Sequence, residues 1–162
     1  LHFDTRGKHY FGIGFPNIAG GYEIRNPFFK GGITPKDISL FHNEESKQSC
    51  FVFEGFIDFL SFMMLRRKEN DGLKRQDYLV LNSVSNIQKA LEPLSHYENV
   101  QCFLDNDEAG RNAYLRLSKE FGNLVTDAST LYSGFKDLNE YLCAESKHSE
   151  KTENKKIRGI KL

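Results

Sequence analysis

Hydrophobic residues in the second half of the chain fall into short continuous runs separated by longer segments with helical periodicity. Four runs have the length and apolar character of strands buried inside a parallel sheet: residues 50–53, 78–81, 100–104 and 124–126. Helical patterns cover residues 56–67, 87–94, 109–121 and 138–144. This alternation predicts an α/β fold in which a four-stranded parallel sheet is flanked by helices.

The ends of the chain follow different patterns. Glycine and aromatic residues punctuate short segments in the first part, which predicts a small β-rich N-terminal subdomain over residues 1–45. Residues 43–49 are polar and indicate a loop before the α/β domain, which we expect to cover residues 46–145. Residues 146–162 are polar and charged, and they predict a flexible tail.

Composition is ordinary for a globular protein of this size, because 39% of the 162 residues are hydrophobic and 27% are charged. The net charge of +0 argues against a protein that binds nucleic acid by electrostatics alone. No apolar run reaches the roughly 20 residues that span a bilayer, and we expect a cytoplasmic protein with no membrane contact. The chain lacks an initiator methionine, so we expect a piece of a longer protein.

Cysteines and histidines give little sign of a metal site. Cys50, Cys102 and Cys143 are odd in number and lack metal-ligand spacing, which favours free thiols in a reducing compartment. The five histidines form no pair with ligand spacing along the chain, and we expect them at the surface.

Carboxylates follow several of the predicted strands at the points where these strands end. Glu54 follows the first strand, Asp105 and Asp107 follow the third, and Asp127 and Asp137 come after the fourth. The carboxyl ends of parallel strands share one edge of a sheet, where ligands usually bind. Oxygen ligands in an open site suit Mg²⁺ or Mn²⁺, which predicts phosphoryl transfer or phosphodiester cleavage.

Structural roles are open for the same residues. Asp107 is also suited to capping the helix that begins near residue 108. Glu54, taken alone, is typical of a solvated turn residue. An EF-hand starting at Asp105 fails because Ala109 and Arg116 stand at ligand positions.

Three short motifs together resemble Toprim domains, in the form seen in bacterial DNA primases. Residues 53–58, Phe-Glu-Gly-Phe-Ile-Asp, resemble the Glu-Gly-x-x-Asp motif, and residues 104–113 with Arg116 resemble the Asp-x-Asp motif and its helix. Residues 136–140, Lys-Asp-Leu-Asn-Glu, resemble a primase segment in which proline stands at the position of Leu138. A looser resemblance to the basic subdomain of primases includes Arg25 and Lys30.

This resemblance implies roles for individual residues. Glu54, Asp105 and Asp107 would be catalytic and would bind Mg²⁺ or Mn²⁺, with Asp137 as a further ligand. Asp58, Gly55 and Gly110 would not bind the metal directly but would support the residues that do. The basic residues that would contact nucleic acid or nucleotide are Arg25, Lys30, Arg111 and Arg116, with ordinary surface charge as the alternative for Arg25 and Lys30, and helix salt bridges as the commoner fate of Arg111 and Arg116.

The resemblance implies a primase-like core that synthesises primers on a single-stranded DNA template from nucleoside triphosphates. A replicative helicase would join through domains outside this sequence, and the lack of a zinc cluster fits a fragment or a shortened primase of a phage or mobile element. Two alternatives are a Toprim metal-dependent nuclease and a nucleic-acid-binding module with an inactive site. An Asp-x-Asp phosphatase is disfavoured, because two strands precede the motif.

Overall fold

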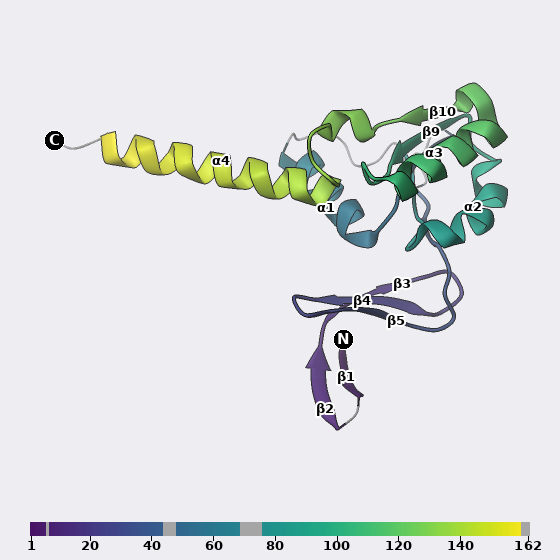
Figure 1. The fold of residues 1–162 in the computed structure, drawn as a ribbon, viewed down its shortest axis with the longest axis horizontal. Coiled ribbons are helices and arrows are strands. Elements are labelled where there is room, and N and C mark those ends of the chain that lie inside the picture. The colour runs from purple at the N-terminus through teal and green to yellow at the C-terminus, as the bar shows by residue number, and fades with distance from the viewer. Residues whose placement is uncertain (6, 44–47, 69–75, 160–162) are drawn as a thin grey trace.

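The protein consists of a small β-rich part and an α/β part, which lie one beneath the other in Figure 1. This computed structural model describes residues 1–5, 7–43, 48–68 and 76–159. Residues 44–47 of the expected loop lie outside the described ranges. Among the described residues, no helix is long and apolar enough to cross a membrane.

Two antiparallel sheets make up the N-terminal part, as the glycine-punctuated pattern predicts. The first is a hairpin of β1 (His2–Thr5) and β2 (Lys8–Phe11). The second is a three-stranded meander of β3 (Ile13–Pro16), β4 (Tyr22–Asn26) and β5 (Phe29–Ile33). Gly21 is needed at the bend before β4, because a Cβ atom there would lie 2.0 Å from the carbonyl oxygen of Pro35.

The α/β part contains a five-stranded sheet with the strand order β10-β9-β7-β8-β6. Its strands are β6 (Ser39–Phe41), β7 (Ser49–Phe53), β8 (Asp77–Val80), β9 (Asn99–Phe103) and β10 (Val125–Asp127). The four predicted strands pair in parallel, which confirms the predicted sheet. Strand β6, which pairs antiparallel with β8 at the edge, was not predicted from the sequence.

The main helices lie where the sequence predicts them, and three short 3₁₀ turns accompany them. The helices are α1 (Phe56–Lys68), α2 (Ile87–Leu94), α3 (Glu108–Phe121) and α4 (Leu138–Gly159), and the turns are η1 (Val84–Asn86), η2 (Gly122–Leu124) and η3 (Ser129–Tyr132). The helix expected over residues 138–144 is longer than predicted and continues to Gly159. This extension projects away from the rest of the molecule (Figure 1).

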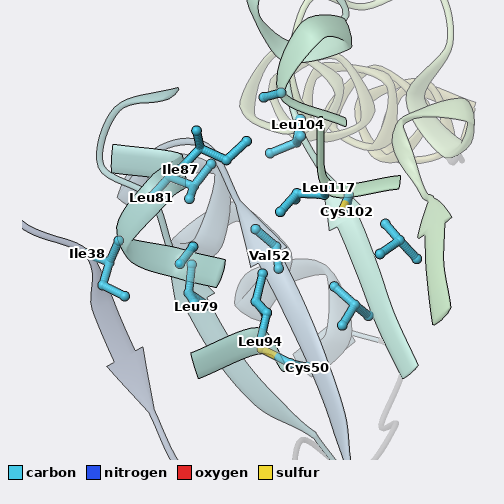
Figure 2. Packing of buried hydrophobic residues seen from close by; sticks show 14 of the residues in the cluster. Ile38, Cys50, Val52, Leu79, Leu81, Ile87, Leu94, Cys102, Leu104 and Leu117 are labelled. Atoms are coloured by element: carbon cyan, nitrogen blue, oxygen red, sulfur yellow. The ribbon is translucent and has the colours of Figure 1, made fainter. Parts of the chain in front are cut away.

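Two hydrophobic clusters cover the two faces of the sheet. One is mainly aliphatic and joins strand residues such as Val52 and Leu79 to Leu94 of α2 and Leu117 of α3 (Figure 2). It contains the buried free thiols of Cys50 and Cys102, whereas the Cys143 thiol is free and exposed. The other is mainly aromatic and lies under α1 and the start of α4.

Phe15 of β3 connects the N-terminal sheet to the aromatic cluster. Its ring stacks on Phe56 with 4.9 Å between the ring centroids, and it also contacts Phe41 and Phe59. The side chain is buried, as 8% of the residue's surface is exposed. Phe15 therefore fixes the N-terminal sheet against the first turn of α1.

We predict that Phe15→Ala lowers the free energy of unfolding by roughly 3 kcal/mol, because it removes a buried ring and leaves a cavity. Urea denaturation followed by circular dichroism measures this loss. Phe28→Ala is the matched control, because Phe28 is 96% exposed, and its effect should stay within about 0.5 kcal/mol. Equal losses in the two variants would contradict a docking role for Phe15.

Candidate functional site

A cavity of about 710 Å³ lies between the N-terminal sheet and the carboxyl ends of β7, β8 and β9. One wall comes from the α/β part and carries four carboxylates, from Glu54, Asp58, Asp105 and Asp137. The facing wall comes from the N-terminal part and includes Glu23, Arg25, Lys30 and Lys36. The cavity therefore has an acidic wall and a mainly basic wall.

The topology of the sheet brings the acidic residues together. Glu54 follows β7 and Asp105 follows β9, and these two strands are parallel neighbours. Asp58 lies in the first turn of α1, and Asp137 directly precedes α4. One carboxylate oxygen each from Asp58, Asp105 and Asp137 lies within 4.8 Å of the others, which is a spacing that one cation can bridge.

Backbone amides hold these carboxylates in place. Asp58 Oδ1 accepts a hydrogen bond of 3.2 Å from the Asn139 amide, and Glu54 Oε2 accepts one of 3.4 Å from the Asp105 amide. Asp137 Oδ1 accepts a hydrogen bond of 2.7 Å from the Glu140 amide, so that Asp137 caps α4. The acidic wall is therefore preorganised by the protein itself.

Burial in the acidic wall favours the protonated form of three of its carboxyl groups. Burial, followed by the charge of Asp105, raises the pKa of Glu54 to about 7. Burial also raises the pKa of Asp58 to about 7, and the charges of Asp105 and Asp137 add to that shift. Burial raises the pKa of Asp105 as well, although Lys136 opposes the shift. Such a donor set fits Mg²⁺ or Mn²⁺, because both prefer oxygen ligands.

Lys136 supplies a positive charge to the acidic wall. Its Nζ lies 3.6 Å from Asp105 Oδ2, and this proximity raises the pKa of the ammonium group. Two backbone contacts hold the segment: the Lys136 amide donates to Glu140 Oε2 at 2.6 Å, and its carbonyl accepts from the Asn106 amide at 2.7 Å. Lys136 was not among the predicted site residues, although it belongs to the third motif.

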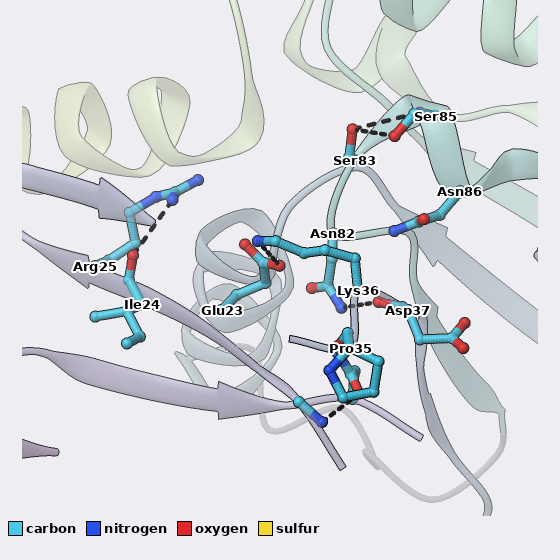
Figure 3. Close-up of polar contacts among 12 residues, drawn as sticks. Glu23, Ile24, Arg25, Pro35, Lys36, Asp37, Asn82, Ser83, Ser85 and Asn86 are labelled. Carbon is cyan, nitrogen blue, oxygen red and sulfur yellow. Dashed lines mark hydrogen bonds and ion pairs between the residues drawn. The ribbon is translucent and has the colours of Figure 1, made fainter. Parts of the chain in front are cut away.

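Charged residues of the basic wall lie on one face of the N-terminal sheet. Arg25 pairs with Lys30 across β4 and β5, and the Arg25 guanidinium lies 5.8 Å from the centroid of the Phe56 ring. Lys36 Nζ donates to Glu23 Oε1 at 2.7 Å, and the Glu23 carboxylate is buried (Figure 3). Sequence analysis missed Glu23 and Lys36, although strand alternation could have placed Glu23 beside Arg25.

The turn after β8 is tied to the segment that leads into β6 and to β6 itself. The Asn82 side-chain amide donates to the carbonyl of Asp37 at 2.9 Å and to Ser39 Oγ at 3.0 Å, and Asn82 has a φ of +62° (Figure 3). Ser83 and Ser85 bond to each other in this turn and line the cavity. The turn therefore presents hydroxyl groups to the cavity.

Several predicted site residues lie outside the cavity lining. Asp107 caps α3, since its Oδ1 accepts a hydrogen bond of 3.0 Å from the Gly110 amide, although its charge still contributes to the raised pKa of Glu54. Arg111 donates to the carbonyl of Asn106 at 3.0 Å, and Arg116 bonds to Gln88. The structure therefore brings Glu54, Asp105 and Asp137 together with Asp58, but not with Arg111 or Arg116.

The two predicted glycines of the site differ in how tightly they are packed. Gly110 is essential for packing, because a Cβ atom there would lie 2.1 Å from the carbonyl oxygen of Asp105. This close approach lets the start of α3 pack directly against the loop that carries Asp105. A Cβ atom on Gly55 would instead meet only Asp58 Oδ2, at 3.3 Å.

Comparisons with known proteins agree with this architecture. A protein-family model described as Toprim-like matches residues 51–142, and one described as a domain of unknown function matches residues 1–34. No curated protein matches the chain. The fold is similar to the primase fragment of the bacteriophage T7 primase-helicase protein, with a TM-score of 0.61 and 22% sequence identity. The match covers 94% of this chain and 64% of that fragment.

A second similar structure is that of the bacteriophage T7 lagging-strand DNA polymerase with primase domains of two subunits bound to an RNA/DNA hybrid and dTTP. Its TM-score is 0.58 at 18% identity, and the match covers 93% of this chain and 78% of that one. At these identities the likeness shows a shared fold, with a mixed sheet and a small antiparallel N-terminal part.

The raised carboxyl pKa values predict that the metal-free protein loses thermal stability between about pH 4 and pH 7. Carboxyl groups of an unfolded chain titrate near pH 4, so in this window the folded state holds protons that the unfolded state has released, and stability falls as pH rises. Melting temperatures with a chelator present measure this effect. Asp58→Asn should flatten the pH dependence, because the variant lacks one group whose pKa is raised to about 7.

Asp127→Asn is the control for this measurement, because Asp127 is the last residue of β10, at the same edge of the sheet, and does not line the cavity. Added Mn²⁺ should raise the melting temperature of the wild type more at pH 7.5 than at pH 5, since bound protons compete with the cation. The same pH dependence in the wild type and in Asp58→Asn would contradict the electrostatic account of this wall.

Proposed function

Because the chain belongs to the Toprim-like family over residues 51–142, we propose that it is a primase-like catalytic core that extends primers on single-stranded DNA by metal-dependent nucleotidyl transfer. The observation that carries this proposal is the cavity with carboxylates on one wall and cations on the other. A nucleoside triphosphate bound to divalent cations needs both kinds of wall, because its phosphates contact the cations on one side and basic side chains on the other.

Asp58, Asp105 and Asp137 would hold one Mg²⁺ or Mn²⁺ ion, since their oxygens already lie within 4.8 Å of one another. Glu54 is adjacent, through the hydrogen bond from the Asp105 amide, and Asp107 adds negative charge from the start of α3. When bound, the cations would neutralise the triphosphate and favour attack by a primer 3′-hydroxyl. In this arrangement Asp58 would be a metal ligand, whereas the sequence resemblance implies only a supporting role for it.

The remaining residues would orient the substrates. Arg25 and Lys30 would contact phosphates of the nucleotide or template, and Lys136 would balance the charge at Asp105. The Arg25 guanidinium lies over the Phe56 ring, which positions it for this role. Burial lowers the pKa of Arg25, and the charges of Glu23 and Asp58 oppose that shift. Arg111 and Arg116 would contact nucleic acid only beyond the cavity.

We extend the proposal to the setting of the protein. The T7 protein with a similar fold is named a primase-helicase, so a replicative helicase is the partner we propose, joined through domains outside this chain. A phage or mobile-element origin and a cytoplasmic location, next to replicating DNA, fit the same function.

The test is extension of an RNA primer already annealed to a DNA template, because this substrate bypasses template capture. With Mn²⁺ and nucleoside triphosphates, we expect the wild type to add nucleotides, and Glu54→Gln and Asp105→Asn to lose about 10²-fold or more of the rate. Asp127→Asn should keep the wild-type rate.

A parallel reaction without nucleoside triphosphates separates the alternatives. If the template is shortened in this reaction only when Asp105 is present, and the reaction with nucleoside triphosphates gives no primer extension, the protein is a nuclease rather than a primase. Binding of the primed template by both the wild type and Asp105→Asn, with neither reaction and no Mn²⁺ binding by calorimetry, would indicate a nucleic-acid-binding module.

A further inference from the structure

The hairpin of β1 and β2 carries a cluster of histidines that is separate from the cavity. Its strands form a two-stranded sheet of their own, and they project away from the α/β part (Figure 1). The register pairs His2 with Phe11 and Asp4 with His9, which places these four side chains on one face of the hairpin. The two histidines are seven residues apart in the chain, so only the hairpin reveals them as neighbours.

Hydrogen bonds on this face fix how the two rings meet. His9 Nδ1 lies 2.9 Å from Asp4 Oδ1, and His9 Nε2 lies 3.2 Å from His2 Nδ1. A carboxylate can only accept a hydrogen bond, so Nδ1 of His9 carries the proton and donates the hydrogen bond to Asp4 Oδ1. In the neutral ring, Nε2 of His9 then presents its lone pair to His2. A single proton therefore occupies the space between the two rings.

We propose that His2 and His9 bind a divalent transition-metal ion, with Zn²⁺ as the representative, in the place of this shared proton. His2 would move its proton to Nε2, so that Nδ1 of His2 and Nε2 of His9 both offer lone pairs. Two imidazole nitrogens, each about 2.0–2.1 Å from a tetrahedral ion, lie roughly 3.3 Å apart. The present separation of 3.2 Å already matches this value.

Asp4 would act as a positioning residue for this site. Metal-ligating histidines usually donate their second N–H to a carboxylate, which fixes the tautomer and the ring orientation. The hydrogen bond between His9 and Asp4 supplies this arrangement before any ion binds. The side chains of His9 and Asp4 are largely exposed, so water can complete the coordination of the ion.

The two sites of the protein would then select different ions. Imidazole ligands suit Zn²⁺, Ni²⁺ and Cu²⁺, whereas a wall of carboxylates suits Mg²⁺ and Mn²⁺. Binding at the histidines would also join β1 to β2 by a bridge between side chains. Isolated two-stranded hairpins are marginally stable in water, so such a bridge would order this end of the chain.

Zn²⁺ titration by calorimetry tests the proposal, using the full chain without a histidine tag and with Mg²⁺ in large excess to occupy the carboxylates. We expect the wild type to bind about one equivalent of Zn²⁺, His2→Ala and His9→Ala each to lose this binding, and Asp4→Asn to bind about tenfold more weakly. His96→Ala is the control, because His96 is an exposed histidine on another part of the surface, and it should bind like the wild type.

Proton NMR of the imidazole rings locates the ion independently of affinity. Zn²⁺ should shift the ring signals of His2 and His9, identified by their loss in the two variants, and leave those of His96 unchanged. Absence of Zn²⁺ binding by the wild type, or equal binding by the wild type and His9→Ala, would overturn the proposal. Neither result depends on primer extension, so this inference and the proposed function stand or fall separately.

Discussion

Burial of several carboxylates, which also repel one another, at one edge of the central sheet is the constraint on which the rest of the site depends. Burial and neighbouring charges raise the pKa of both Glu54 and Asp58 to about 7, so ionisation of these two carboxyl groups without a cation destabilises the protein. Lys136 and the backbone amides of Asp105 and Asn139 offset part of this cost. A bound cation would offset the remainder, which makes the wall a natural receptor for one.

The parallel sheet could be predicted because its strands are buried on both faces and therefore form continuous apolar runs. Helix α2 begins and ends where the pattern indicates, but β6 could not be found, since a three-residue edge strand has too little pattern of its own. The helical backbone over residues 145–159 also escaped prediction. Its residues are mostly polar, so no apolar stripe marks them as a helix that packs on the core.

The site could be predicted only as far as strand ends determine it. Glu54 and Asp105 follow neighbouring strands, and their meeting is a consequence of parallel topology. Asp58 joins them from the first turn of α1, and the motif resemblance named this residue but gave it a supporting role rather than that of a ligand. Glu23 could have been inferred from its alternation with Arg25 on β4, whereas Lys36 required knowledge of how the N-terminal part docks on the sheet edge. The prediction was therefore limited by which distant segments of the chain meet in the fold, and less by recognising which residue types could form the site.

The departure at Leu138 from the primase pattern has a simple structural explanation. Asp137 caps α4, so Leu138 is the first residue of the helix, a position where proline is tolerated but not required. The Leu138 side chain is buried in the aromatic cluster beside α1. Leucine thus gains apolar contacts at a position where proline would mainly restrict the backbone.

Phe56 gives the cavity a property that neither wall has alone. Phe15 stacks on its ring, the Arg25 guanidinium lies near it, and in the chain it follows Glu54 and Gly55 directly. Any ligand that contacts both walls would therefore add its binding free energy to the docking of the N-terminal sheet. Ligand binding and docking of the N-terminal sheet are then thermodynamically linked, so a ligand in the cavity also stabilises the contact that Phe15 makes with Phe56.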